Sequence, residues 1–235
     1  MNNKMEKDFD LFRKDRGISG TSLYQYQNVI DGYINPTIIE ERQLNVAQMD
    51  VFSRLMMDRI VFLGTAIDDT VSNIITSQLL YLSSIDGSTP IQLYLNSPGG
   101  DIYAGYSILD TMEFIEPKIN TMVCGMAASM AFILSISGDQ RSALRHSRLM
   151  QHQPLGGAHG QASDILISAK QIELVRDELY EIIAKRTGQP IEKVKVDCDR
   201  DYWMTAAEAF KYGAVDKVIG MPDLKKEDKE NKKEE

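Results

Sequence analysis

Short β-rich runs alternate with stretches of helical periodicity through the first half of the chain, and this pattern limits the possible folds. The β-rich runs lie at 59–63, 91–95 and 118–123, and the amphipathic stretches between them cover 69–85 and 101–115. No repeat or low-complexity linker interrupts this region. The alternation predicts an α/β fold with βα repeats that folds as one unit.

A long helix is expected further along the chain. Ser163 is the expected N-cap, and Gly188 followed by Pro190 ends the helical pattern. Such a helix has about 24 residues and spans roughly 36 Å. Its apolar surface either projects to meet another subunit or belongs to an ordinary core helix, and both readings are open. The apolar positions with helical spacing are Ile165, Ala169, Ile172, Leu179 and Ile183.

A second helix is indicated near the end of the domain. Thr205 and Glu208 form the pattern of a capping box, and Gly213 is suited to the C-terminal end of the helix. The strand expected at 215–219 then closes the domain.

Composition and charge exclude several classes of protein. With 235 residues and 43% hydrophobic content, the chain can bury the core of one domain. Its 26 basic and 34 acidic side chains give a formal net charge of -8, which lacks the basic footprint of nucleic-acid binding. The two cysteines, Cys124 and Cys198, form neither a disulfide framework nor a metal-ligand cluster. We therefore expect no metal and no nucleic-acid partner.

Neither a signal peptide nor a membrane span is evident. Residues 1–17 lack an apolar h-region, and the longest nearly apolar run, 126–136, is far short of the roughly 20 residues that cross a bilayer. We expect a cytoplasmic protein without a membrane partner. Residues 1–35 and 221–235 are polar and charged and are expected to be flexible, which leaves a domain at 36–220.

The segment Gly125-Met-Ala-Ala-Ser129-Met130 marks a change from a β-rich run to a helical one. Ser129 is expected in the first turn of that helix, where free N–H groups and the helix dipole stabilise a developing oxyanion. The N–H of Met130 is then one donor. The Asn96-Ser-Pro-Gly-Gly100 loop, which follows a strand, offers the N–H of Gly100 as a second. Each motif alone is also common for packing and turning.

A serine nucleophile requires a histidine base. His152 ends an apolar run and precedes a Gln-Pro-Leu-Gly-Gly loop, so it is expected at a strand end, where catalytic side chains are commonly presented. His146 lies among charged residues and His159 in a glycine-rich loop, and both are expected to be surface residues. The third group, an acid, is left open by local reasoning among Asp197, Asp199 and Asp201.

These motifs, taken in order, resemble those of the proteolytic subunit of Clp proteases, the ClpP family. The resemblance extends from about residue 36 to 219 and includes Gly125–Met130, the 150–157 segment and the 197–202 segment. It implies a crotonase-like ββα superhelix with a long handle helix. It also implies that Ser129, His152 and Asp201 form a catalytic triad, with Gly100 and Met130 as oxyanion donors.

The resemblance further implies an assembly and a partner. The family forms two stacked heptameric rings, a tetradecamer that encloses its active sites, with Ile172 and Leu179 expected at the contact between rings. A hexameric AAA+ unfoldase, ClpX- or ClpA/ClpC-type, delivers unfolded proteins and peptides in protein quality control, and its docking pocket is expected to include Tyr94, Phe114 and Ile219. The chain lacks a phosphate-binding Gly-x-x-x-x-Gly-Lys-[Ser/Thr] motif, so we expect no cofactor here and ATP use by the partner.

Several positions depart from the family pattern. The segment 138–145 is about two residues shorter, Gln151 stands where the family usually has an apolar residue, and Gln92 replaces an aromatic residue of the docking pocket. Residues 1–35 lack a counterpart and are expected to be a propeptide or an added segment. Two alternatives to a Clp peptidase are a catalytically silent ring subunit, which would be expected to lack a triad residue, and a crotonase-type acyl-CoA enzyme.

Overall fold

The computed structural model describes residues 37–42 and 45–222, and the chain divides into two compact units, Met1–Arg54 and Leu55–Glu235. The first unit contains an antiparallel hairpin of β1 (Thr37–Arg42) and β2 (Asn45–Asp50), which the sequence analysis did not predict. Helix α3 (Val51–Met57) follows it. The boundary between the two units falls inside the domain predicted at 36–220. The segment expected to be flexible at 1–35 and nearly all of the one at 221–235 lie outside the described residues.

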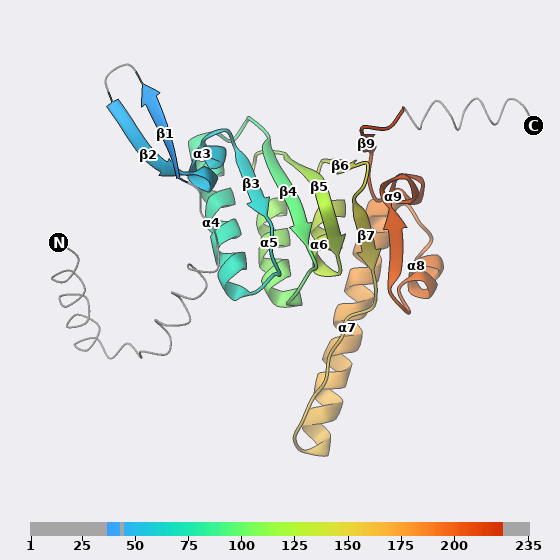
Figure 1. Cartoon of the computed structure of the whole chain (residues 1–235). Coiled ribbons are helices and arrows are strands. Elements are labelled where there is room, and N and C mark those ends of the chain that lie inside the picture. The colour runs from blue at the N-terminus through green and yellow to red at the C-terminus, as the bar shows by residue number, and fades with distance from the viewer. Residues whose placement is uncertain (1–36, 43–44, 223–235) are drawn as a thin grey trace, which may run out of the picture. The chain divides into compact units, whose positions relative to one another are not determined.

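Parallel strands form the centre of the second unit, and the predicted alternation of strands and helices is confirmed (Figure 1). The parallel strands follow the order β3-β4-β5-β6-β9, and β7 pairs in parallel with the end of β5. Strand β8 pairs antiparallel with β7. The bounds are β3 (Ile60–Leu63), β4 (Ile91–Ser97), β5 (Ile119–Ala128), β6 (Gln140–Leu144), β7 (Arg148–Gln151), β8 (Tyr202–Thr205) and β9 (Lys217–Ile219).

Three helices cover one face of this sheet. Helix α4 (Asp69–Ile85) begins at the N-cap Asp68, whose carboxylate accepts from the N–H of Val71, and α5 (Ile102–Phe114) begins at Asp101 in the same way. Helix α6 (Met130–Ile136) is buried along its whole length. Side-chain carboxylates therefore satisfy N–H groups that the first turns of α4 and α5 would leave unpaired.

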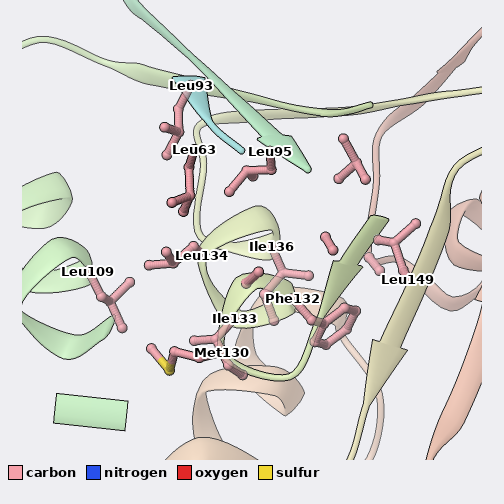
Figure 2. Close-up of a cluster of buried hydrophobic side chains, with 14 of the residues drawn as sticks. Leu63, Leu93, Leu95, Leu109, Met130, Phe132, Ile133, Leu134, Ile136 and Leu149 are labelled. Carbon is pink, nitrogen blue, oxygen red and sulfur yellow. The ribbon is translucent and has the colours of Figure 1, made fainter. Parts of the chain in front are cut away.

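The core lies between this face and the three helices. Leu93 and Leu95 of β4 point inward, whereas the alternate residues Gln92 and Tyr94 are half-buried on the other face. Phe132 of α6 is fully buried in the same cluster, near Ile133, Ile136 and Leu149 (Figure 2). Complete burial of each such side chain contributes roughly 1.5–3 kcal/mol before the entropy cost of ordering it. The core thereby fixes α6, and with it the turn that precedes α6.

Helix α7 (Ala162–Thr187) has 26 residues and extends away from the sheet (Figure 1). It ends at Gly188, which adopts the left-handed conformation at φ 76° as predicted, but its N-cap is Gln161 rather than Ser163. Only its second half contributes buried residues. The first half exposes apolar side chains, which rules out an ordinary core helix for this segment; they are Ile165, Leu166 and Ile167.

The two residues expected at a contact between rings differ in burial. Leu179 is 6% exposed in the single subunit and belongs to its hydrophobic core, and its role at a contact between rings stays a prediction. Ile172 is half-buried, and the backbone at Gly156 passes so close that a Cβ there would lie 2.6 Å from its Cδ1. Helical spacing identified the apolar positions of α7 but did not show which of them another element of the same chain covers.

Two short helices complete the unit. Helix α9 (Ala206–Tyr212) has the predicted capping box of Thr205 and Glu208, and its C-cap Gly213 has φ 87°. Helix α8 (Ile191–Asp197), which begins after Pro190, was not predicted. Seven residues are too few for a clear periodic pattern, so tertiary contacts decide whether this segment is helical.

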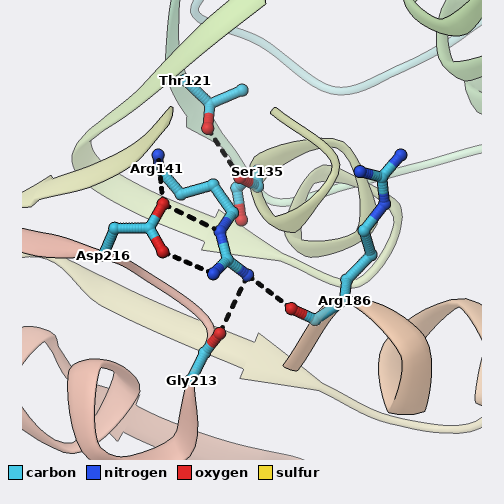
Figure 3. Close-up of polar contacts among 6 residues, drawn as sticks. All are labelled: Thr121, Ser135, Arg141, Arg186, Gly213 and Asp216. Atoms are coloured by element: carbon cyan, nitrogen blue, oxygen red, sulfur yellow. Dashed lines mark hydrogen bonds and ion pairs between the residues drawn. The ribbon is translucent and has the colours of Figure 1, made fainter. Parts of the chain in front are cut away.

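Arg141 joins the ends of two helices to the start of β6 (Figure 3). Its guanidinium pairs with the carboxylate of Asp216 at 2.6 Å and donates to the carbonyls of Arg186 and Gly213 at 2.7 and 2.9 Å. These carbonyls belong to the last turn of α7 and the C-cap of α9, positions where helical hydrogen bonding leaves acceptors unpaired. One side chain thus holds three elements together.

We predict that Arg141→Met lowers the free energy of unfolding by about 1–3 kcal/mol, because partly buried acceptors lose a charged donor. Urea unfolding at a fixed protein concentration measures the loss. Arg145→Met, which changes an exposed arginine of the same segment, is the control and should leave the midpoint nearly unchanged. Equal midpoints for the two variants would contradict the role assigned to Arg141.

Candidate active site

Ser129 occupies a strained turn between β5 and α6. It is the N-cap of α6 rather than part of its first turn, and its φ of 56° is one of two positive values among the described residues other than glycine. A residue other than glycine in such a conformation costs on the order of 1–3 kcal/mol. The N–H of Ser129 donates to the carbonyl of Met150 at 2.9 Å. This bond anchors the turn to β7 and leaves the serine side chain as the projecting group.

The end of β5 reaches β7 because the strand changes partners midway. Its first half pairs with β6 and its last residues pair with β7, with Ala128 opposite Met150. Between Leu95 and Ser97, two steps along β4 correspond to four along β5, and Gly125 in this irregularity has φ 103°. An irregularity of this kind bends a strand and redirects the residues that follow it.

The Pro-Gly-Gly loop after β4 lies directly against the turn of Ser129. A Cβ added at Gly99 would lie 2.7 Å from the Cβ of Ser129 and 2.9 Å from the amide nitrogen of Met130. A Cβ at Gly100 would lie 2.1 Å from the carbonyl oxygen of Ile67. Both glycines are required by close backbone approach, so the loop and the serine turn form one structural unit.

The two expected oxyanion donors, Gly100 and Met130, lie next to the residues that make this contact, Gly99 and Ser129. Met130 is the first residue of α6, a position whose N–H has no acceptor within the helix. The bridge between Ile67 and Gly100 uses the N–H groups of Ile67 and Asp101 and leaves the N–H of Gly100 outside the pairing. Two backbone donors beside a nucleophile are the arrangement that stabilises a tetrahedral oxyanion.

His152 follows directly after β7, as predicted for a residue at a strand end. Its Nε2 lies 2.8 Å from the Oγ of Ser129, within hydrogen-bond reach. The strand pairing explains why Ser129 and His152 are close. Strands β5 and β7 are parallel with Ala128 opposite Met150, so both residues follow the ends of neighbouring strands that run in the same direction. His146 and His159 are exposed, as expected of surface residues.

The structure selects one acid from the cluster that local reasoning left open. The Oδ1 of Asp201 lies 3.0 Å from the Nδ1 of His152. Asp197 instead accepts from the hydroxyl of Tyr212, and the exposed Asp199 lies beside the amide of Gln153. Strand β8 brings Asp201 into place, because Tyr202 at its start pairs with Gln151 of β7.

The resulting constellation is suited to nucleophilic acyl transfer. Serine hydroxyl, imidazole and carboxylate are connected in series, so the imidazole can accept the serine proton while the carboxylate orients the ring. The side chain of His152 is 16% exposed, whereas that of Asp201 is 61% exposed. The acid therefore lies near solvent and depends on its neighbours for its position.

An apolar pocket opens beside Ser129, and this feature was not predicted. It is lined by side chains from α5, α6 and α7 together with Ser129, Gln151, His152 and Pro154. A second pocket, reaching Ile172 and Val175, shares Ile102 and Pro154 with the first. Such a surface suits an apolar substrate side chain next to the scissile bond. The sequence signal was weak, because the lining residues lie on three separate helices; they include Ile102, Phe132, Leu179 and Ile183.

The residues expected to dock a partner do not gather in one described pocket of the single subunit. Tyr94 and Ile219 are half-buried on β4 and β9, which two other strands separate, and Phe114 is 81% exposed at the end of α5. Neither pocket described above contains any of the three. Their role in docking stays a prediction.

No group of three or more histidine, cysteine or acidic side chains in residues 37–42 and 45–222 could hold a metal ion. Over the same residues, no helix is long and apolar enough to cross a membrane. Burial raises the pKa of the Cys198 thiol to about 12, so this cysteine is an inert core residue rather than a nucleophile.

The chain was compared with protein families and known proteins. Residues 42–222 match the family model described as Clp protease. A protein of Porphyromonas gingivalis is 58% identical over 205 residues, covering 86% of this chain and 92% of the relative. Proteins of Bacteroides fragilis and Bacteroides thetaiotaomicron are 59% and 55% identical, over 80% and 88% of this chain and 92% and 94% of theirs. All three relatives are named ATP-dependent Clp protease proteolytic subunit.

The geometry of the acid cluster generates a matched pair of variants. We predict that Asp201→Asn lowers the rate of peptide hydrolysis by about 10⁴-fold, the loss typical of a triad whose acid becomes an amide and stabilises the wrong imidazole tautomer. Asp199→Asn changes an exposed acid two residues away and should retain the rate within about twofold. Initial rates on a short fluorogenic peptide provide the measurement, and equal rates for the two variants would contradict the choice of Asp201.

Proposed function

The chain belongs to the Clp protease family, a family of serine endopeptidases, and from this premise we propose that Ser129, His152 and Asp201 are its catalytic triad. The single observation that supports the proposal most strongly is the connected series of contacts, 2.8 Å from Ser129 to His152 and 3.0 Å from His152 to Asp201. Three residues separated by up to 72 positions in sequence meet with the atoms that a triad requires.

The proposed reaction begins with proton transfer. The Nε2 of His152 accepts the proton of the Ser129 hydroxyl while Oγ attacks the scissile carbonyl carbon. The carboxylate of Asp201 holds the ring in the tautomer that leaves Nε2 free to accept and stabilises the imidazolium that forms. The N–H groups of Gly100 and Met130 bind the oxyanion of the tetrahedral intermediate.

The intermediate then collapses to an acyl-enzyme. The imidazolium gives its proton to the leaving amine as the peptide bond breaks, and the acyl group remains on Ser129. Water, activated by His152 in the same way, attacks the ester and releases the second product. Every step uses side chains, backbone N–H groups or water, so the mechanism requires no cofactor bound to this chain.

The exposed first half of α7 supports a proposal of assembly into two stacked heptameric rings. Leu166 and Ile167 are 71% and 68% exposed in the single subunit, and exposed apolar side chains on neighbouring positions usually mark an interface. Contacts made by an element that extends away from its own domain are suited to joining subunits. Enclosure of the active sites in a chamber would admit peptides and unfolded chains and exclude folded proteins.

ATP dependence in the names of the relatives points to a partner, because this chain has no phosphate-binding loop motif. We assign the use of ATP to a hexameric AAA+ unfoldase, of the ClpX or the ClpA/ClpC type, which would deliver unfolded proteins in quality control. Tyr94, Phe114 and Ile219 remain the proposed docking residues, and a cytoplasmic location is part of the same proposal. The connected triad favours an active peptidase over a silent ring subunit.

We predict that Ser129→Ala reduces peptide hydrolysis by roughly 10⁴- to 10⁶-fold without changing folding or assembly. A fluorophosphonate probe with peptide mapping tests the same residue independently, since the unaltered protein should carry the label on Ser129 alone. Normal hydrolysis by Ser129→Ala, or labelling at another serine, would refute the proposed nucleophile.

We predict that the double variant Leu166→Asp and Ile167→Asp forms smaller assemblies, because the contact between rings would bury uncompensated charge. Sedimentation velocity distinguishes single rings from stacked rings. The double variant Gln161→Asp and Ser163→Asp, which adds the same two negative charges at exposed polar positions at the start of α7, is the control. Full-size assemblies of the double variant would reject this face as the interface.

A further inference from the structure

A second polar network, a series of linked hydrogen bonds, lies behind β7, the strand that ends just before His152. Gln151 is 1% exposed, and its Nε2 donates to the hydroxyl of Tyr212 at 2.8 Å. That hydroxyl donates to the Oδ2 of Asp197 at 2.7 Å, and the ammonium of Lys193 pairs with the same oxygen at 2.5 Å. This polar network runs from the interior of β7 through α9 to the end of α8.

The polar network connects the two segments that hold the triad residues His152 and Asp201. Gln151 is the residue before His152, and Asp197 is the last residue of α8, four positions before Asp201. The ring of Tyr212 also packs against Tyr202, the residue after Asp201, with 5.8 Å between centroids. The position of Asp201 relative to His152 therefore depends on contacts that pass through Tyr212.

The energetics of Gln151 indicate a role other than stability. Its Oε1 is buried without a hydrogen-bond partner among the described residues, which costs on the order of 1–3 kcal/mol. An apolar side chain at this position would avoid that cost. It would also leave the bond from Tyr212 to Asp197 in place, so the hydrogen bond that depends on the Gln151 amide is the link between β7 and the pair α8–α9.

The protonation state of the Tyr212 hydroxyl determines the direction of the hydrogen bonds in the polar network. Burial raises the pKa of Tyr212, and so does its hydrogen bond to Asp197, so the hydroxyl keeps its proton at neutral pH. Because the one phenolic proton points to Asp197, the oxygen of Tyr212 is available to accept from Gln151. Each hydrogen bond therefore supports the next.

On the other side of His152, Gln153 holds the same loop. Its N–H donates to the carbonyl of Cys198 at 2.7 Å, and its side-chain amide donates to the carbonyl of Asp199 at 3.0 Å. The residues on both sides of the histidine are thus bonded toward the segment that presents the acid. Asp201, being largely exposed, has its position set by these backbone and side-chain contacts.

We propose that Gln151 is a positioning residue, which acts through Tyr212 and Asp197 to hold the carboxylate of Asp201 at the correct distance from His152. The inference rests on the triad proposed above. Displacement of a catalytic group by about 1 Å can cost on the order of 10²-fold in rate. Loss of the link alone is expected to cost less than loss of the acid.

The test uses Gln151→Met, which keeps the side-chain volume but removes the amide. On a short fluorogenic peptide, kcat should fall about 10- to 100-fold while KM changes less than twofold, and the thermal midpoint should not fall. Tyr212→Phe removes the hydroxyl at the centre of the same polar network and should lower kcat by a similar factor. Gln189→Met, which removes an amide bonded to the carbonyl rather than the hydroxyl of Tyr212, should retain kcat.

The decisive comparison is with the acid itself. If Gln151 acts by positioning Asp201, Gln151→Met should have almost no further effect on kcat when Asp201 is already Asn, because there is no carboxylate left to position. An equal fall in both backgrounds, or an unchanged kcat in Gln151→Met, would overturn the inference. If Ser129→Ala and Asp201→Asn retained full activity, the triad would fail, which is a separate outcome.

Discussion

The hydrogen bond from the N–H of Ser129 to the carbonyl of Met150 is the contact on which the arrangement of the site depends. It closes the pairing of β5 with β7 and holds a serine at a positive φ that it would otherwise avoid. The buried helix α6 on one side and Gly99 on the other leave the turn little room to relax. The buried core and the closely packed glycine loop thus hold Ser129 in its strained conformation.

The same pairing determines where the base and the acid lie. Because β7 continues from its register with β5 directly into His152, the imidazole reaches Ser129 without a mobile segment between them. Strand β8 then pairs with β7 and places Asp201 at the other ring nitrogen. The acid is the most exposed of the three groups, so the buried contacts of Gln151, Tyr212 and Asp197 behind it form the natural support for its position.

Helix α7 serves two purposes along its length. Its second half is buried, and Leu179 and Ile183 line the pocket beside Ser129. Its first half extends from the sheet with apolar side chains exposed. A surface proposed for joining rings is therefore continuous, through one rigid helix, with a wall of the substrate pocket. Contacts made by the exposed first half of α7 can therefore change the shape of that pocket only if α7 or the elements packed against it move.

Local signals in the sequence were sufficient for much of the fold. The capping box of Thr205, the left-handed glycines at 188 and 213 and the alternation through β3, α4, β4 and α5 were predicted, because caps, turns and periodicity act over a few residues. The positions of Ser129 at a strand-to-helix turn and His152 at a strand end were readable for the same reason. The short helix α8 and the hairpin of β1 and β2 were missed.

The tertiary structure decided what depends on distance. Asp201 could be separated from Asp197 and Asp199 by resemblance, but only the pairing of β7 with β8 brings its carboxylate to His152. The helical spacing of Leu179 left open whether it faces its own core or another subunit, and in the single subunit it is buried. Strand register and burial arise from contacts between segments far apart in the chain, and a slip of one residue would turn each side chain to the other face. Local motifs therefore indicated the serine and the histidine, and the family resemblance indicated the acid, whereas long-range pairing decided which of these groups meet.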